Sequence, residues 1–253
     1  MDFPLIELKE TDSTSRYLND WCDEQHDKVE PFTMVLADYQ SAGKGQRGNS
    51  WESEAGKNLT FSFVIYPDFL PAKRQFLISQ LISLGIVEAL RKYEIAEESA
   101  FSVKWPNDIY YLDKKICGML IETFLQGMNL GRCICGIGIN VNQKHFLSDA
   151  PNPISLCQII GKQTDRKELL RCVMHEIGIF YDLLKKDEVS ASEELIKRYT
   201  ANLYRRKGMH CYKDTEGVFL ARFVKVEPDG RLFLEDTEGK IRNYLFKEVQ
   251  YII

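Results

Sequence analysis

The sequence predicts an α+β protein, in which a mixed, mostly antiparallel sheet is backed by helices and followed by a small C-terminal β-barrel. Short β-rich runs separated by turn residues fill the stretch from residue 101 to residue 141, and a long apolar helix pattern precedes them. After residue 204 the pattern changes to short alternating strands with closely spaced turn signals. We therefore expect a large domain over residues 1–204 and a small one over residues 205–253, which suits a chain of 253 residues.

The composition excludes several classes of protein. Apolar residues make up 44% of the chain, which is enough for a packed core and argues against disorder. The net charge is −4, so no overall positive field attracts nucleic acid or anionic lipid, and any polyanion site must be local. The N-terminus lacks the apolar segment of a secretory signal, and polar residues interrupt the most apolar stretch, residues 76–90. We expect a cytoplasmic protein without membrane contact, whose seven cysteines are reduced and mostly buried.

The first half of the chain predicts two helices and two strands around a glycine-rich segment. Asp12 and Ser13 supply side-chain oxygens that can cap a helix over residues 14–22. Leucines and isoleucines at helical spacing predict a core-packing helix over residues 73–93. The expected strands cover residues 34–37 and 59–66, and the glycine-rich loop between them covers residues 41–50.

The second half predicts further strands, two covering helices and the barrel. Asp165 with Glu168, and Ser190 with Glu193, are capping pairs that start the two helices. Strands are expected over residues 101–105, 109–112, 116–124 and 132–141. The turn signals of the barrel are Asp214–Gly217, Glu227–Gly230 and Asp236–Gly239.

The glycine-rich loop matches two nucleotide-binding motifs only in part. Residues 43–48 fit the dinucleotide pattern G-x-G-x-x-G, but poor helix formers follow the third glycine, so the helix N-terminus that seats a pyrophosphate is missing. The loop also approaches the P-loop pattern, but Asn49 stands where the phosphate-binding lysine belongs. The remaining features are glycines that allow close backbone approach and the cations Lys44 and Arg47, which predict an anion site. The alternative is a surface loop with two solvated cations.

A second group of polar residues surrounds a predicted hairpin. The run Lys104–Asp108 places a lysine, an amide and a carboxylate at the end of a strand, and a hairpin through residues 111–114 would return Lys115 beside Asp108. Residues 136–140 carry glycines that allow close approach and end in Asn140, whose amide can read a base edge. The alternatives are solvated lysines, a core tryptophan and an ordinary turn.

Taken in order, six segments resemble the biotin protein ligases. The resemblance covers residues 5–142 and implies that family's class II synthetase-like catalytic fold, followed by a small SH3-like barrel. Repressor members of the family carry a helix-turn-helix before the catalytic domain, but here the first segment comes too early for one to fit, so no DNA binding is expected. The segments are Asp12–Thr14, Tyr39–Gly43, Gly48–Trp51, Lys104–Asp108, Lys115–Glu122 and Gly136–Asn142.

The resemblance implies a two-step ligation that uses biotin, ATP and Mg²⁺. Biotin and MgATP would give biotinyl-5′-AMP and pyrophosphate, and a lysine of a biotin carboxyl carrier protein would then attack the adenylate and release AMP. The enzyme needs no nucleophile of its own, which agrees with four histidines that lie in no triad-like or metal-like context. No resident metal site is expected, and Mg²⁺ would arrive with ATP near Asn107 and Asp108.

The family pattern assigns biotin to the N-terminal segments and the glycine-rich loop. Hydroxyls and an amide would bond the ureido ring, which requires neutral donors and acceptors, although helix capping is the alternative role of the hydroxyls. The loop backbone would follow biotin and close over the adenylate, with a tryptophan as an apolar wall. The expected biotin-binding residues are Ser13, Thr14, Ser15, Gln40, Gly43, Lys44, Gly45, Gln46, Trp51, Lys115 and Gly118.

The same pattern assigns cations and amides to ATP and to catalysis. Lys115 would contact the biotin carboxylate and the α-phosphate, Arg47 would steady the triphosphate, and Asp108 would orient the incoming lysine; these three are the expected catalytic residues. The family's loop is usually richer in arginine, and Lys44 and Gln46 replace two arginines here, which implies faster leakage of the adenylate. The expected ATP-binding residues are Lys44, Arg47, Trp51, Lys104, Asn107, Lys115 and Asn140, of which the last would read adenine.

Two other functions remain open from the sequence. A lipoate protein ligase shares the fold and the acyl-adenylate chemistry, although Gln40–Trp51 and Lys104–Asp108 favour biotin. A non-catalytic module that binds nucleotide, RNA or protein is the other alternative, and the near-neutral charge of the C-terminal part argues against it. The carrier protein and the oligomeric state, monomer or homodimer, also stay open.

Overall fold

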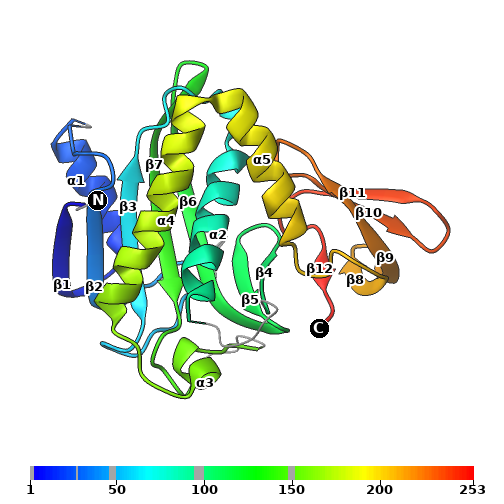
Figure 1. Ribbon diagram of the computed structural model, residues 1–253, viewed down its shortest axis with the longest axis horizontal. Helices are drawn as coiled ribbons and strands as arrows, with labels where there is room; N and C mark the ends of the chain where they lie inside the picture. Colours follow the sequence, from blue (N-terminus) through cyan, green and yellow to red (C-terminus); the bar gives the residue numbers. More distant parts are fainter. Residues whose placement is uncertain (1–2, 27, 46–49, 94–99, 148–151) are drawn as a thin grey trace.

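The described part of the chain contains two sheets and the helices that pack on the larger one (Figure 1). A seven-stranded sheet comes first, and a separate five-stranded sheet is formed by the C-terminal part. The predicted α+β class is therefore confirmed. The computed structural model describes residues 3–26, 28–45, 50–93, 100–147 and 152–253.

The large sheet is mixed and mostly antiparallel, as predicted. Its order is β1-β2-β3-β7-β6-β5-β4; β1 and β2 are parallel, and all other neighbours are antiparallel. Strand β3 is buried along its whole length, although Thr60 and Ser62 interrupt its apolar residues. The strands are β1 (Leu5–Thr11), β2 (Met34–Gln40), β3 (Leu59–Ile65), β4 (Phe101–Lys104), β5 (Asp108–Tyr111), β6 (Lys114–Gln126) and β7 (Asn129–Ile139).

Helices cover both faces of this sheet. Helices α2, α4 and α5 lie over one face, where their apolar stripes form the main core with alternate residues of the strands (Figure 1). On the other face, α1 packs Leu18 and Cys22 against Val35 and Val64 in a second, smaller cluster. The helices are α1 (Thr14–Glu24), α2 (Phe76–Arg91), α3 (Leu156–Ile160), α4 (Arg166–Lys186) and α5 (Glu188–Ala201), with a 3-10 turn η2 (Ala72–Arg74) before α2.

Three elements differ from the sequence expectations. Strand β1 was not expected, because it carries several charges at an edge of the sheet and shows no buried run. Helix α3 was not expected either. Helix α5 begins after Asp187 rather than at Ser190, because the Asp187 carboxylate accepts a hydrogen bond from Ser190 N at 3.1 Å and caps the helix. The Asp165 cap of α4 is confirmed.

The C-terminal part forms an antiparallel sheet in the order β11-β10-β9-β8-β12. The three predicted turns connect its strands, and Gly217, Gly230 and Gly239 have the positive φ that such turns favour. An SH3-like closure of this sheet and the division between residues 204 and 205 stay predictions. The strands are β8 (His210–Asp214), β9 (Gly217–Val226), β10 (Leu232–Asp236), β11 (Ile241–Tyr244) and β12 (Gln250–Tyr251).

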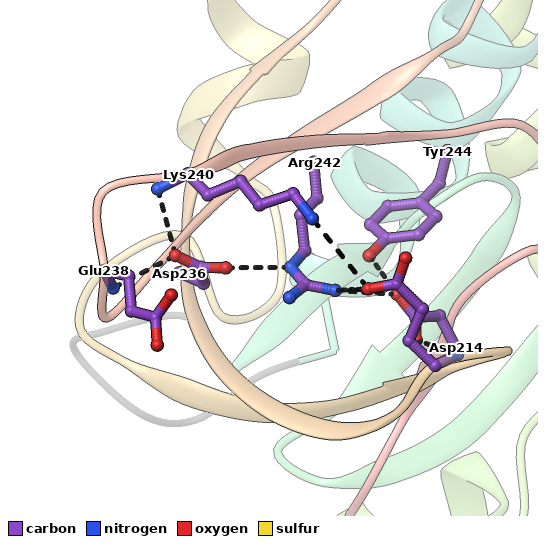
Figure 2. A network of polar contacts seen from close by, with 7 residues as sticks. Asp214, Asp236, Glu238, Lys240, Arg242 and Tyr244 are labelled. Carbon is purple, nitrogen blue, oxygen red and sulfur yellow. Dashed lines mark hydrogen bonds and ion pairs between the residues drawn. The ribbon is translucent and has the colours of Figure 1, made fainter.

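One arginine links three strands of the small sheet (Figure 2). Arg242 donates to Asp236 Oδ2 at 2.9 Å and to Asp214 Oδ2 at 3.3 Å, and Tyr244 OH donates to Asp214 Oδ2 at 2.6 Å. Burial opposes ionisation of Asp214, but the hydrogen bonds from Tyr244 and Arg242 outweigh it and lower the pKa of this carboxyl. Charge-assisted hydrogen bonds therefore supplement the small apolar interior of this sheet.

The two sheets share one hydrophobic core. Trp105, which follows β4, donates its indole N–H to Gly230 O in the β9–β10 turn at 2.8 Å. The ring of Phe246 packs against the rings of Trp105 and Phe76, with centroids 5.5 and 6.0 Å apart. The buried core continues from the large sheet into the small one. The C-terminal segment is consequently held beside strands β4 and β5 (Figure 1).

Two further expectations can be compared with the structure. None of the seven cysteines forms a disulfide, and five of them are buried, as predicted. None of the helices in the described ranges combines the length and the apolar character needed to cross a membrane.

Candidate active site

A cleft with a volume of about 1110 Å³ gathers most of the predicted site residues. It runs over strands β3, β7, β6 and β5. Its walls are completed by the described ends of the glycine-rich loop and by four C-terminal residues, Lys247, Val249, Gln250 and Tyr251. Gln46 and Arg47 lie outside the described residues. The predicted residues that line the cleft are Ser13, Thr14, Ser15, Gln40, Lys44, Gly45, Trp51, Lys104, Asn107, Asp108, Lys115, Gly118 and Asn140.

Gly43 is the predicted residue that packs behind the cleft lining. A Cβ atom there would lie 2.8 Å from Trp51 O and 3.3 Å from Gln40 Nε2. Trp51 N donates to Gly43 O at 3.0 Å, and an isolated bridge joins Lys44 to Ser50. The glycine therefore lets the two ends of the loop close on each other, which places the Trp51 ring over the sheet.

A cluster of neutral polar groups lies where α1 begins. Ser13 caps the helix, and Thr14 and Ser15 follow it, all three buried against β2 and β3. Thr14 donates to Gln40 Oε1 from its backbone N at 2.8 Å and from its hydroxyl at 3.0 Å. The Ser62 hydroxyl lies 2.8 Å from Thr14 Oγ1 and 2.9 Å from Ser15 Oγ. These groups are neutral donors and acceptors, so they suit an uncharged polar ligand group.

Glycines on β7 and β6 form the floor under Trp51. A Cβ at Gly138 would lie 2.3 Å from Trp51 Cε2, and one at Gly118 would lie 3.1 Å from Trp51 Cζ3. No other residue type could accept the ring this closely. The indole Nε1 is buried and has no hydrogen-bond partner among the described residues.

The predicted hairpin brings Lys115 back to Asp108. Lys115 Nζ lies 2.8 Å from Asp108 Oδ1 and 5.7 Å from the centroid of the Trp51 ring. The backbone of Lys115 is fixed by hydrogen bonds with Asn152 O at 2.8 Å and with Ile154 N at 2.9 Å. The prediction that these two charges meet is confirmed, and the ammonium group is held at a defined point of the cleft wall.

Lys104 lies on the other side of Asp108, directly opposite it in the β4–β5 ladder. Its ammonium group lies 5.1 Å from the ring centroids of both Tyr110 and Tyr251. Burial lowers the pKa of Lys104, Asp108 acts in the opposite direction, and Lys115 lowers it further. Two cations therefore flank one carboxylate, which leaves a net positive charge for an anionic ligand.

The two predicted amides also have structural roles. Asn107 Nδ2 donates to Met119 O and so joins the turn after β4 to strand β6. Asn140 Nδ2 donates to Ile154 O at 3.2 Å, and its backbone bonds Ile116 O at 2.9 Å. Both side chains are buried at the cleft, and their predicted contacts with phosphate and adenine stay predictions.

Several residues at the cleft or directly behind its lining were not predicted. Ser62, which lies behind the lining, could have been found, because it is one of two polar residues in the buried strand β3. Tyr251, Gln250 and Lys247 carry no local signal, since only the packing of the C-terminal sheet brings them to the cleft. No group of three or more His, Cys, Asp or Glu side chains that could hold a metal ion is found in the described part of the chain.

Comparisons with known proteins agree with this geometry. The chain matches the model of the Biotin/lipoate A/B protein ligase family over residues 7–140. It is 32% identical over 240 residues to the bifunctional ligase/repressor BirA of Salmonella typhimurium, a match that covers 94% of this chain and 71% of that protein. It is 28% identical over 213 residues to the BirA protein of Bacillus spizizenii, covering 82% of this chain but only 62% of that relative's length.

A solved structure extends the likeness to the whole fold. The biotin protein ligase from Aquifex aeolicus, in complex with biotin and ATP, superposes with a TM-score of 0.77 at 31% identity, covering 98% of this chain and 99% of that one. The family match spans more than half of the sequence and includes the cleft residues from Ser13 to Asn140. The chain therefore belongs to the Biotin/lipoate A/B protein ligase family.

Proposed function

We propose that this protein is an ATP-dependent biotin protein ligase. It would convert biotin and MgATP into biotinyl-5′-AMP and pyrophosphate, and then transfer biotin to a lysine of a biotin carboxyl carrier domain. The observation that carries this proposal is the order of the groups along one cleft. Neutral polar groups lie at β3, an aromatic wall lies over β7 and β6, and the Lys115–Asp108 pair lies at β6 and β5.

The strand order gives the length of the ligand that would fit. Ser62 pairs with Gly136, Gly138 pairs with Gly118, and Gly118 pairs with Asp108. From β3 to β5 the cleft crosses three strand spacings, about 14 Å in all. A ligand with a neutral polar ring at one end and a carboxylate at the other would place the ring on the hydroxyls and the carboxylate beside Lys115. Biotin has this form.

In the first step, a carboxylate oxygen of biotin attacks the α-phosphorus of ATP, and pyrophosphate leaves. Lys115 stabilises the negative charge that the reacting carboxylate and phosphate share, since it is fixed before the substrates arrive. In the second step, the amine of the carrier lysine attacks the acyl carbon, the bond to AMP breaks, and the amine loses a proton. Asp108, which is paired with Lys115, would orient the incoming amine.

Magnesium enters this scheme with ATP, as part of the substrate. Magnesium bound with a nucleotide commonly takes one or two protein oxygens and several phosphate oxygens. Asp108 and Asn107 are adjacent cleft residues whose side-chain oxygens suit this, and no group of three or more acidic, His or Cys side chains that could hold a metal ion is found among the described residues. The ion would screen the phosphates during attack on phosphorus.

The test is incubation of the protein with biotin, MgATP and a biotin carboxyl carrier domain, with the carrier mass as the readout. The carrier is expected to gain the mass of one biotinyl group. A carrier whose acceptor lysine is replaced by arginine should not be modified. Exchange of labelled pyrophosphate into ATP, measured with biotin or with lipoate, shows which of the two acids in the family name the protein activates. Exchange with lipoate alone would contradict the proposal.

A further inference from the structure

The orientation of one side-chain amide is set by the backbone. Gln40 receives a hydrogen bond from Thr14 N at 2.8 Å. Because a backbone N–H can only donate, the Gln40 atom at this position is the carbonyl oxygen, and Nε2 points elsewhere. The Thr14 hydroxyl contacts the same oxygen at 3.0 Å, so it must donate its single proton there.

The remaining hydroxyl protons then follow one direction. Since Thr14 has used its proton, the 2.8 Å contact with Ser62 is a hydrogen bond only if Ser62 donates to Thr14 Oγ1. Ser62 has then used its own proton, so the 2.9 Å contact with Ser15 is a hydrogen bond only if Ser15 donates. One assignment satisfies all three contacts: Ser15 donates to Ser62, Ser62 to Thr14, and Thr14 to Gln40.

The middle of this chain is sealed from the cleft. Ser62 is fully buried on β3 and is not among the residues that line the cleft, whereas Ser15, Thr14 and Gln40 line it. A Cβ at position 136 would lie 2.4 Å from Ser15 Oγ, so Gly136 leaves the space that this hydroxyl occupies. Ser62 acts on a ligand only through its neighbours.

We propose that Ser62 is a positioning residue that fixes the polarity of the ligand site. Its hydroxyl takes the Ser15 proton, so Ser15 presents only lone pairs to the cleft, and Gln40 presents its Nε2 donors. The site thus selects a ring with an N–H donor at Ser15 and a carbonyl acceptor near Gln40. A cyclic urea has this pattern. In a cyclic carbamate a ring oxygen replaces one N–H, so the lone pairs of that oxygen would face the lone pairs of Ser15 Oγ. The inference rests on the proposed function.

The test measures Kd by titration calorimetry without ATP, for biotin and for the two cyclic carbamate isomers of biotin. For the wild type, the Kd of the weaker-binding carbamate isomer is expected to exceed that of biotin by about tenfold or more, since a mismatched buried polar group is costly. Ser62→Ala frees the Ser15 proton and should lower this preference by about fivefold or more. Thr14→Val frees the Ser62 proton and should act in the same direction.

Two matched variants control for lost stability. Ser83→Ala removes another buried hydroxyl, which donates to Ser79 O at 2.7 Å within α2, and Thr60→Val removes one that donates to Ala37 O at 2.8 Å. Both should keep the wild-type preference. If both Ser62→Ala and Thr14→Val bind biotin with an unchanged preference, the role of Ser62 is overturned, but the proposed function is not. A wild type that fails to bind biotin would overturn the proposed function as well.

Discussion

At the scale of single residues, Asp108 organises two lysines that have different surroundings. Lys115 pairs with its carboxylate at 2.8 Å and lies over the Trp51 ring, and both partners of the ion pair keep some contact with solvent. Lys104 lies 5.1 Å from the centroids of two tyrosine rings, and burial lowers its pKa. The first is suited to meet reacting groups, and the second to add a fixed positive charge behind them.

Lys115→Ala should lower the rate of adenylate formation by about 10²–10³, the usual cost of removing one preorganised group that stabilises developing charge. Its unfolding free energy should change by no more than about 1 kcal/mol, because partly exposed ion pairs contribute little. Pyrophosphate exchange and urea titration measure the two effects. Lys114→Ala, an exposed neighbour on β6, is the control and should keep full activity. A large loss of stability in Lys115→Ala would show a structural role instead.

Lys104 should make stability depend on pH. Burial lowers its pKa below the ordinary 10.5, and at neutral pH the cost of burying the charge is present in full. As pH rises from the folded pKa towards 10.5, the folded state gives up its proton before the unfolded state does, so stability rises. The free energy of unfolding of wild type minus that of Lys104→Met should therefore increase between neutral pH and pH 10.5. Urea titrations across this range would contradict the expectation if the difference stayed constant.

At the scale of elements, the core face of the large sheet depends on how closely two helices approach. Gly85 of α2 faces Ile177 of α4, and a Cβ at this glycine would lie 2.6 Å from Ile177 Cγ1 and 2.9 Å from Ile177 N. The second distance involves backbone, so a rotamer change cannot relieve the overlap. On the other face α1 holds the hydroxyl cluster, which depends in the same way on Gly136.

Gly85→Ala has two effects on stability that act in opposite directions. Alanine in place of glycine favours a helix by about 1 kcal/mol. Overpacking of a helix contact costs about 1–3 kcal/mol, and here the neighbour that must move is backbone. We expect a net loss of about 1–2 kcal/mol in the free energy of unfolding, since overpacking exceeds propensity. A variant as stable as the wild type in urea would show that α2 and α4 can separate.

At the scale of the whole molecule, the two sheets act as one folded unit. The core runs through Trp105 and Phe246 from one sheet to the other, and Lys247, Gln250 and Tyr251 reach the cleft from the C-terminal part. A cleft assembled from both ends of the chain requires that both sheets be folded at the same time.

Trp105→Phe tests this coupling. The phenyl ring keeps most of the packing but leaves the buried Gly230 carbonyl without its donor, which should cost about 1–3 kcal/mol. Fluorescence and circular dichroism should both report a single transition at a lower urea midpoint. Trp21→Phe, on the other face of the sheet, is the matched control and should change the midpoint less. Two separate transitions in the wild type would contradict a shared core.

The sequence by itself determined the elements whose causes are local. Apolar spacing, helix caps and turn glycines predicted most helices and strands, and the hairpin register predicted that Lys115 returns to Asp108. Motifs read in order predicted most of the cleft lining, because these residues are close in sequence to the turns that present them. Strand β1 was missed because an edge strand needs only one paired side and carries no buried run.

Only the tertiary structure decided which distant residues meet at the cleft. Tyr251 has no local signal for a site, since only packing brings it beside Lys104. Ser62 is marked in the sequence as a polar residue of a buried strand, but only its contacts with Thr14 and Ser15 place it behind the cleft lining. The direction of the hydroxyl chain likewise follows from distances between three elements. Such contacts join segments far apart in the chain, and their geometry is fixed by packing rather than by neighbouring residues.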